Sequence, residues 1–263
     1  MKIDAFIINV ESCVKRREIL LKELEKFPKL VPHVVVAVEG KNLLEEEINN
    51  VYLSPNNFFQ RLIRLKLTNN EIACVLSHLK CVKEISNKGL EYALILEDDA
   101  VFSNTFQDSV LESIKFIKKS KKPAVVLFSA RTTIAKKAKF KMNGFSFHKC
   151  INGVGSYGYL INYKAAQIIA KKYIPFSDVS DDWFKYVCLG IKVFSVQPHQ
   201  LSFFGEEDDS LLRKDRNENW NNWQKWVKKY YFLYRVFQKI RFRSIFTMTW
   251  MLINRGVVTK KMW

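Results

Sequence analysis

The sequence predicts an α/β domain in which a mostly parallel β-sheet is flanked by helices. Between residues 3 and 197, short apolar runs typical of buried strands alternate with longer stretches typical of helices. This alternation favours parallel strands, because each helix carries the chain back across the sheet. The chain has 263 residues, 48% of them apolar, which allows a large core and excludes a disordered chain.

The N-terminal part begins with two expected strands and one expected helix. Apolar runs at residues 3–10 and 33–40 favour buried strands, and the basic stretch 14–27 between them favours a helix. Residues 41–70 are polar, contain Pro55 and several Asn, and are expected to be irregular.

The next expected helix, 69–87, has signals at both ends. Thr68 is followed three residues later by Glu71, which is a capping-box pattern, and Gly89 is a stop signal. An apolar run then predicts a strand at 92–99.

The rest of the predicted domain continues the alternation. The lysine-rich segment 131–150 is expected to be a loop or a hairpin. The remaining expected elements are helices at 107–120, 164–173 and 181–189 and strands at 123–130, 153–161 and 191–197. The glycines of 153–161 would allow close approach of another backbone.

Positive charge is concentrated at the C-terminal end. The formal net charge is +17, and the residues from 211 onward hold 13 basic and 2 acidic side chains, or +11 of that total. We therefore divide the chain into a domain at 1–210 and a basic, aromatic, helical extension at 211–263. Such a field favours anionic partners, namely nucleic acid, phosphorylated small molecules or an acidic membrane surface.

Cysteine usage and the apolar runs bear on location. The five cysteines include no C-x-x-C pair, which indicates unpaired thiols in a reducing compartment and disfavours zinc. The start, MKIDAFIINV, lacks a long apolar region, and no run approaches the ~20 apolar residues that span a bilayer. The expected location is cytoplasmic.

Three consecutive acids end the strand at 92–99. In open α/β sheets, ligands bind at the carboxyl ends of strands, and oxygen ligands suit Mg²⁺ or Mn²⁺. Glu97 and Asp99 would point to one face of the sheet and Asp98 to the other. The alternative is that these are solvated acids at a strand exit.

A second polar group follows the first strand. Asn9, Ser12, Arg16 and Arg17 gather where strand 3–10 meets helix 14–27, a usual place for a nucleotide. No G-x-G-x-x-G or G-x-x-x-x-G-K-[ST] motif occurs, which disfavours dinucleotide and P-loop chemistry. The alternative is that the two arginines form a solvated helix face.

A series of motifs between residues 3 and 200 resembles glycosyltransferase family 25, which includes bacterial lipooligosaccharide and lipopolysaccharide glycosyltransferases. In order, the motifs are Asn9-Val10 with Arg16-Arg17, TNNEIACVLSH at 68–78, LILEDDA at 94–100, GSYGYLIN at 155–162, Ser180-Asp181-Asp182, and Val196-Gln197-Pro198. The most specific parts are Glu-x-x-Cys-x-x-Ser-His and Leu-Glu-Asp-Asp.

The resemblance implies a GT-A fold, which is Rossmann-like, and an inverting transfer. The expected donor is a UDP-sugar, most often UDP-galactose. The expected acceptor is a sugar of a lipid-linked lipooligosaccharide or lipopolysaccharide core, which would receive a β-linkage. A glucosyltransferase of the same pathway is the first alternative.

The resemblance also implies roles for individual residues. Asp99 is the first choice for binding Mn²⁺ or Mg²⁺, with Glu97 at the metal, a metal-bound water or the ribose, and with His199 as a further metal ligand. The expected donor-binding residues are Asn9, Val10, Ser12, Arg16, Arg17, Glu71, Ser77, His78, Glu97 and Asp98.

The resemblance makes Asp181 or Asp182 the best candidate for the catalytic base that an inverting displacement needs. From composition alone, both acids would simply compensate the dipole at the start of the helix 181–189, an effect of about 0.3–1 kcal/mol. The two interpretations remain open for each residue.

The extension predicts a strongly amphipathic helix at 220–239. Trp, Tyr, Phe and Val side chains fall on one face and Lys and Arg side chains on the opposite face. This pattern suits an anionic membrane surface, engaged through 220–255, and would place the protein peripherally on the inner face of the inner membrane. The alternative is that the aromatic face packs on the catalytic domain or on a partner chain, so a homo-oligomer is left open.

A nucleic-acid-binding protein or metal-dependent nuclease is the alternative from another class. A basic and aromatic segment can grip phosphates and stack bases. Here the positive charge is segregated from the predicted strands, and no recognised nucleic-acid module occurs. We therefore expect no nucleic-acid partner.

Overall fold

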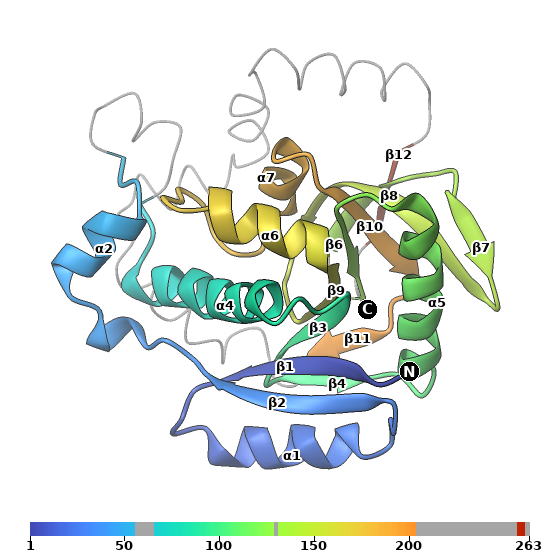
Figure 1. Ribbon diagram of the computed structural model, residues 1–263, viewed down its shortest axis with the longest axis horizontal. Coiled ribbons are helices and arrows are strands. Elements are labelled where there is room, and N and C mark those ends of the chain that lie inside the picture. Colours follow the sequence, from blue (N-terminus) through green and yellow to red (C-terminus); the bar gives the residue numbers. More distant parts are fainter. Residues whose placement is uncertain (56–65, 129–130, 204–256, 261–263) are drawn as a thin grey trace.

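The structure is a computed structural model that describes residues 1–55, 66–128, 131–203 and 257–260. A ten-stranded sheet lies at its centre, with strand order β12-β6-β8-β10-β5-β9-β3-β1-β2 and with β7 paired to β8 (Figure 1). Its strands are β1 (Ile3–Asn9), β2 (Leu30–Val36), β3 (Tyr92–Glu97), β5 (Ala124–Leu127), β6 (Arg131–Ala135), β7 (Phe140–Met142), β8 (Phe145–Val154), β9 (Gly158–Asn162), β10 (Lys192–Gln197) and β12 (Val257–Lys260). A separate two-stranded sheet pairs β4 (Ala100–Phe102) with β11 (Leu201–Phe203).

Most strands of the large sheet run in one direction. Strands β2, β1, β3, β5, β10, β6 and β7 share a direction, whereas β9, β8 and β12 run the opposite way. The predicted α/β class with a mostly parallel sheet is therefore confirmed. The reversed strand β9 lies between β3 and β5, so its first residue, Gly158, meets the carboxyl end of β3.

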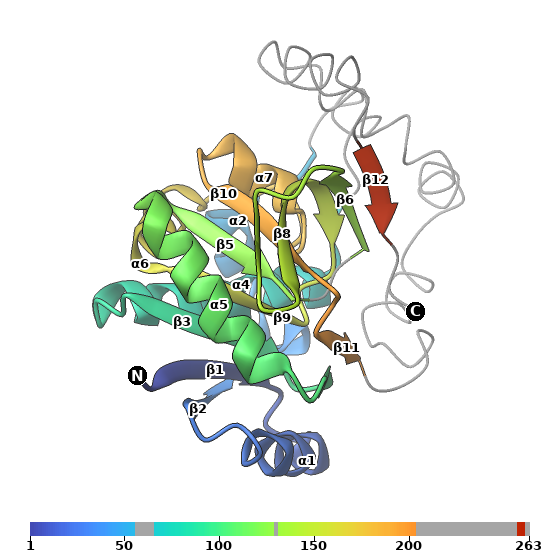
Figure 2. The same cartoon turned by 90° about the vertical axis from the view of Figure 1, so that its right-hand side faces the viewer.

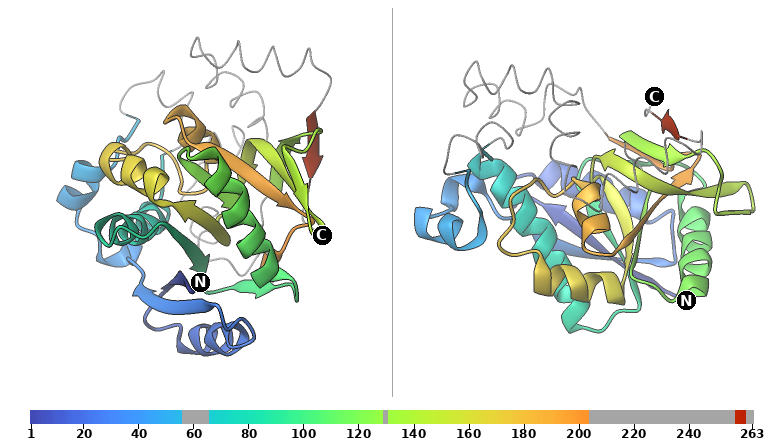
Figure 3. Two further views of the ribbon diagram at one scale, coloured as in Figure 1. Left: turned by 45° about the vertical axis from the view of Figure 1, so that its right-hand side comes forward. Right: turned by 90° about the horizontal axis from the view of Figure 1, so that it is seen from above.

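Helices cover both faces of the sheet (Figures 1 to 3). They are α1 (Val14–Leu24), α2 (Glu45–Val51), α4 (Asn69–Asn87), α5 (Phe106–Ser120), α6 (Tyr163–Lys172) and α7 (Trp183–Cys188), with a 3₁₀ turn η1 (Gly40–Asn42). Buried side chains of α4, α6 and α7 pack on one face, and those of α1 and α5 pack on the other. The result is a three-layer arrangement.

The alternation of side chains along a strand divides the core into two clusters. On β1, Phe6 and Ile8 pack with α4, whereas Ala5 and Ile7 pack on the α1 and α5 side. All four are nearly inaccessible, which explains the unbroken apolar run of this central strand. Each large buried side chain contributes about 1.5–3 kcal/mol relative to an exposed one.

The ends of several elements differ from the sequence predictions. β2 begins at Leu30 and ends at Val36, three residues before the expected range begins and four before it ends. The segment 41–70, expected to be irregular, contains most of η1 and all of α2, and the segment 131–150 contains β6, β7 and the start of β8. The capping box of α4 is confirmed, because Thr68 Oγ1 accepts from the Glu71 amide and Glu71 accepts from the Thr68 amide.

Only a short part of the predicted extension is described. Val257–Lys260 pairs antiparallel with β6 at the edge of the large sheet, as Figure 2 shows. The expected boundary at 210, the helix 220–239 and the surface 220–255 lie outside the described residues. In the described part of the chain, no helix combines the length and the apolar character needed to cross a membrane.

Candidate functional site

The candidate site lies where β1 and β3 end. These two strands are parallel neighbours, so Asn9 and the acids at the end of β3 come to the same edge of the sheet. Because β9 runs the other way, the residues just before Gly158 lie at this edge too. The hydrogen bond from the Glu97 amide to the Tyr157 carbonyl, 2.9 Å, joins the two chain segments there.

Asp98 faces helix α1. Its Oδ2 accepts a hydrogen bond of 2.7 Å from Asn9 Nδ2, and its Oδ1 lies 3.6 Å from an Arg16 guanidinium nitrogen. Asn9 also donates to the Cys13 carbonyl and accepts from Arg17. The predicted cluster of Asn9, Arg16 and Arg17 therefore meets the acid triplet directly, and both arginines add positive charge beside it.

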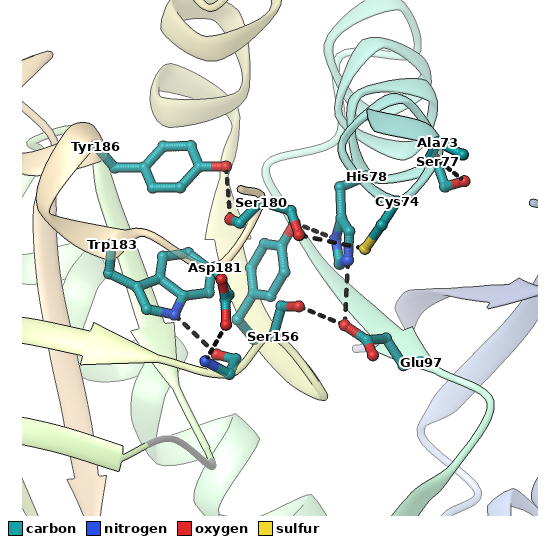
Figure 4. A network of polar contacts seen from close by, with 12 residues as sticks. Ala73, Cys74, Ser77, His78, Glu97, Ser156, Ser180, Asp181, Trp183 and Tyr186 are labelled. Carbon is teal, nitrogen blue, oxygen red and sulfur yellow. Dashed lines mark hydrogen bonds and ion pairs between the residues drawn. The ribbon is translucent and has the colours of Figure 1, made fainter. Parts of the chain in front are cut away.

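Glu97 faces the opposite side, toward helix α4 (Figure 4). Its Oε1 is 3.2 Å from His78 Nε2 and accepts a further hydrogen bond from the Ser156 hydroxyl. His78 Nδ1 lies 3.1 Å from the hydroxyl of Tyr159, whose ring stacks on the imidazole. These contacts fix one carboxylate oxygen of Glu97. Glu97 and Asp98 point to opposite sides, as the alternation of side chains along a strand predicts.

His78 is held as a cation. Burial works to lower the pKa of His78, but hydrogen bonds with Cys74 and Glu97 outweigh burial and raise this pKa to about 10. The charged ring can then donate through both nitrogens, to Glu97 and to Tyr159. Burial also works to raise the pKa of Glu97, yet His78 and Ser156 lower it. Both shifts favour an imidazolium beside a carboxylate.

The charge of Asp99 is compensated only in part, by Arg16 and by a backbone hydrogen bond. Its Oδ1 atom is buried and has no hydrogen-bond partner among the described residues. Burial, followed by repulsion from Glu97 and Asp98, raises the pKa of Asp99 to about 7. A buried carboxylate oxygen without a donor is costly, so this position favours a bound cation.

A fourth acid, Asp181, reaches the same edge from the other side. Asp181 Oδ2 accepts a hydrogen bond of 2.7 Å from the Gly155 amide. The indole of Trp183 donates to the Gly155 carbonyl over 2.8 Å. The adjacent Asp182 has a different role, because its carboxylate caps helix α7 by accepting from the Phe184 amide.

The comparison with protein families decides which family the chain belongs to. The model of glycosyltransferase family 25 (LPS biosynthesis protein) matches residues 2–183, which include Asn9, the acid triplet and Asp181. The chain belongs to glycosyltransferase family 25. This confirms the resemblance found from the motifs.

Relatives within family 25 are distant. The chain is 26% identical over 168 residues to procollagen galactosyltransferase 2 of Mus musculus and 30% identical over 106 residues to procollagen galactosyltransferase 1 of Danio rerio. These matches cover 62% and 40% of this chain but only 27% and 17% of the relatives. A third relative, 24% identical over 132 residues (50% of this chain and 22% of the relative), is called probable inactive glycosyltransferase 25 family member 3 of Bos taurus.

Among solved structures, the chain aligns with a mannose-1-phosphate geranyltransferase from Thermus thermophilus. The TM-score is 0.35 and the identity 9%, over 77% of this chain and 75% of that one. A similarity this low carries no argument about fold or function.

Four residues predicted for the donor site make structural contacts or lie in a turn. Glu71 takes part in the capping box, and Ser77 accepts from the Val38 amide and donates to the Ala73 carbonyl. Val10 accepts from the Cys13 amide in the turn after β1, and Ser12 is exposed in that turn.

His199 does not come to Asp99. The β4–β11 ladder pairs Ala100 with Phe203 and Phe102 with Leu201. Asp99 therefore lies beside one end of the ladder and His199 beside the other. Gln197 Nε2 lies 3.4 Å from the His199 ring nitrogen Nε2.

Sequence reasoning missed three residues of this site. Gly155, Ser156 and Trp183 contact the acids or each other, but their partners are far away in the sequence. The sequence did contain a signal for these residues, because Gly155 and Ser156 begin the GSYGYLIN motif and Trp183 follows Asp182. Periodicity assigned them only to a strand and a helix.

Proposed function

We propose that this chain is an inverting glycosyltransferase that uses Mn²⁺ or Mg²⁺ and a UDP-sugar. The transferred hexose is galactose, and the acceptor is a sugar of a bacterial lipooligosaccharide or lipopolysaccharide core that receives a β-linkage. Family membership supports the reaction class, and the names of the relatives support galactose. The chain spans about a quarter of the first relative's length.

The observation that carries the proposal is the unpaired oxygen of Asp99. This atom belongs to a triplet of acids at the strand edge where α/β sheets bind ligands, and Arg16 lies 3.6 Å from the neighbouring Asp98. Within the described residues, no three His, Cys, Asp or Glu side chains form a ready metal site. That fits a cation held by one or two carboxylates together with substrate phosphates, which is how Mg²⁺ is usually bound.

The donor side of the site uses the acids and the arginines. Asp99 would hold the cation, with Glu97 contributing the oxygen that His78 and Ser156 leave free. The cation, when bound, supplies positive charge that stabilises the departing diphosphate. Arg16 and Arg17 add charge of the same sign from α1, and Asn9 joins Asp98 to Arg17 by donating to the one and accepting from the other.

Asp181 is the better of the two candidates for the base. Its Oδ2 is held by Gly155, and Oδ1 makes no hydrogen bond to the described residues. Asp182 is engaged as a helix cap. In the transfer, the bond from the sugar C1 to the diphosphate oxygen breaks and its electron pair leaves on UDP. The acceptor oxygen bonds to C1, and its proton passes to Asp181 Oδ1.

UDP release tests this function most directly. Purified protein is assayed with UDP-galactose, UDP-glucose and other UDP-sugars, with Mn²⁺ or EDTA, and with truncated lipooligosaccharide as acceptor. We expect acceptor-dependent release with UDP-galactose that EDTA abolishes. Asp99→Asn should abolish it as well, whereas Asp108→Asn, on the exposed face of α5, should not. Metal-independent release, or full activity of Asp99→Asn, would contradict the proposal.

The UDP-release assay and a thermal-shift measurement distinguish the alternatives. A preference for UDP-glucose would identify the glucosyltransferase. A thermal shift with an oligonucleotide but none with UDP and Mn²⁺ would favour the nucleic-acid-binding class.

We further propose that residues 220–255 bring the protein to an anionic membrane, where a lipid-linked acceptor resides. The support is the amphipathic pattern alone. Changing Lys225, Lys228 and Lys229 to Glu should reduce sedimentation with anionic vesicles, because each basic residue near such a surface contributes about 1 kcal/mol. The same change at Lys136, Lys137 and Lys139 is the control, and equal binding of both variants would contradict the proposal.

A further inference from the structure

Residues Gly155–Tyr157 connect the two halves of the site, and we refer to them as the 155–157 bridge. On one side, the Ser156 hydroxyl and the Tyr157 carbonyl bind the carboxylate and the amide of Glu97. On the other side, the Gly155 amide binds Asp181 and the Gly155 carbonyl accepts from the Trp183 indole. Figure 4 shows the side-chain contacts on both sides.

The conformation of the bridge is specific. Gly155 has a φ of 101°, in the region that favours glycine over residues with a side chain. Ser156 is buried, and its hydroxyl donates to Glu97. The ring of Trp183 is buried and packs edge-on against Tyr159, which fixes the indole N–H toward Gly155.

The bridge holds one oxygen of each carboxylate. All hydrogen bonds that Glu97 makes through its side chain within the described residues use Oε1, and the one that Asp181 makes uses Oδ2. The other oxygen of each acid remains available. The separation of these two oxygens is therefore set by three consecutive residues, without any direct contact between the acids.

We propose that Ser156 is a positioning residue, which holds Glu97 at a fixed distance from Asp181 through the 155–157 bridge. This inference rests on the proposed function, in which Glu97 lies on the donor side and Asp181 accepts the acceptor proton. When the bridge is intact, the acceptor hydroxyl and the base are aligned with the sugar C1. When it is loosened, water competes for the same carbon and gives free sugar and UDP.

The predicted effect is on the ratio of transfer to hydrolysis. Small misplacements of reacting groups can lower a rate by about 100-fold. For Ser156→Ala we expect the ratio of glycoside formed to free sugar formed to fall by about tenfold, since only one contact of the bridge is lost. A loss of folded protein would scale both products equally and leave the ratio unchanged.

The test measures glycoside and free sugar from a radiolabelled UDP-sugar in the same reaction, with full-length protein. Ser156→Thr, which keeps the hydroxyl, should restore the ratio. Trp183→Phe, which removes the indole N–H from the Gly155 carbonyl, should lower it. Ser113→Ala is the control, because Ser113 is a buried serine on α5 whose hydroxyl donates to the Ser109 carbonyl, away from the acids.

The outcomes separate the two proposals. If the unmodified protein makes glycoside and Ser156→Ala keeps the same ratio, the positioning role is excluded and the proposed function stands. If the unmodified protein releases no UDP from any UDP-sugar, the proposed function fails first. A lower ratio in Ser113→Ala as well would show a general effect of buried serine loss and would also overturn the positioning role.

Discussion

Asn9 Nδ2 lies 2.7 Å from Asp98 Oδ2, and this hydrogen bond joins the carboxyl ends of β1 and β3. Asn9 is almost fully buried, and its amide oxygen is taken by Arg17. One side chain therefore organises both the acid and the arginine on the α1 side of the site.

Replacing Asn9 should destabilise the fold as well as the site. Asn9→Ala removes one hydrogen bond each from Asp98, the Cys13 carbonyl and Arg17, which we expect to cost about 1–3 kcal/mol in free energy of unfolding. Urea denaturation measures this. Asn50→Ala, at an exposed position in α2, should change stability by less than about 0.5 kcal/mol. Equal stability of the two variants would mean that the hydrogen bonds of Asn9 are unimportant.

The two adjacent acids at α7 should respond differently to the same substitution. Asp182→Asn keeps a good helix cap, so its turnover and stability should stay close to those of the unmodified protein. Asp181→Asn should bind UDP-sugar normally but lose turnover, because an amide cannot accept the proton. Titration calorimetry and UDP release measure the two properties. Full activity of Asp181→Asn would remove it as the base.

The capping box of α4 should contribute measurably to stability. Thr68→Ala removes the hydroxyl that accepts from the Glu71 amide, with an expected cost of about 0.5–2 kcal/mol. Thr68→Ser keeps that hydroxyl and should lie much closer to the unmodified protein in thermal and urea unfolding. If the alanine and serine variants unfold at the same temperature and urea concentration, the cap makes no net contribution to stability.

The cysteines should differ in reactivity with a thiol reagent. Burial raises the pKa of the Cys81 thiol to about 12, so at about pH 9 the folded protein keeps this thiol neutral, whereas the unfolded chain ionises it in part. Stability from this group should therefore fall as the pH rises through the ordinary thiol pKa. Mass mapping after brief labelling at about pH 8 should find the exposed Cys188 modified and Cys81 unmodified until the protein is unfolded. Rapid labelling of Cys81 in the folded protein would contradict this.

The fold was largely predictable because its central strands are apolar on both faces. The run IDAFIIN and the capping box at Thr68 depend on local signals, and both are confirmed. The strands within 131–150 were harder to recognise, because the segment that forms β6, β7 and the start of β8 is rich in lysine. Pairing with the rest of the sheet overrides local composition there.

The candidate site was predictable only where contacts follow from strand geometry. Alternation correctly separates Glu97 from Asp98, and the common edge of parallel strands brings Asn9 to the acids. The role of Ser156 depends on the reversed strand β9, which no local pattern indicates. Asp181 and Asp182 are neighbours with the same chemistry, and only the structure distinguishes the cap from the acid bound to Gly155.

The pairing of β12 with β6 matters for anyone who shortens this chain. A protein that stops near residue 210 would lose Val257–Lys260 and leave the β6 edge open, with backbone groups ready to pair with another molecule. Aggregation of such a fragment would then result from the uncovered edge of β6, and it would not measure binding to a membrane. An internal excision that retains the last strand is the cleaner way to ask what the basic segment does.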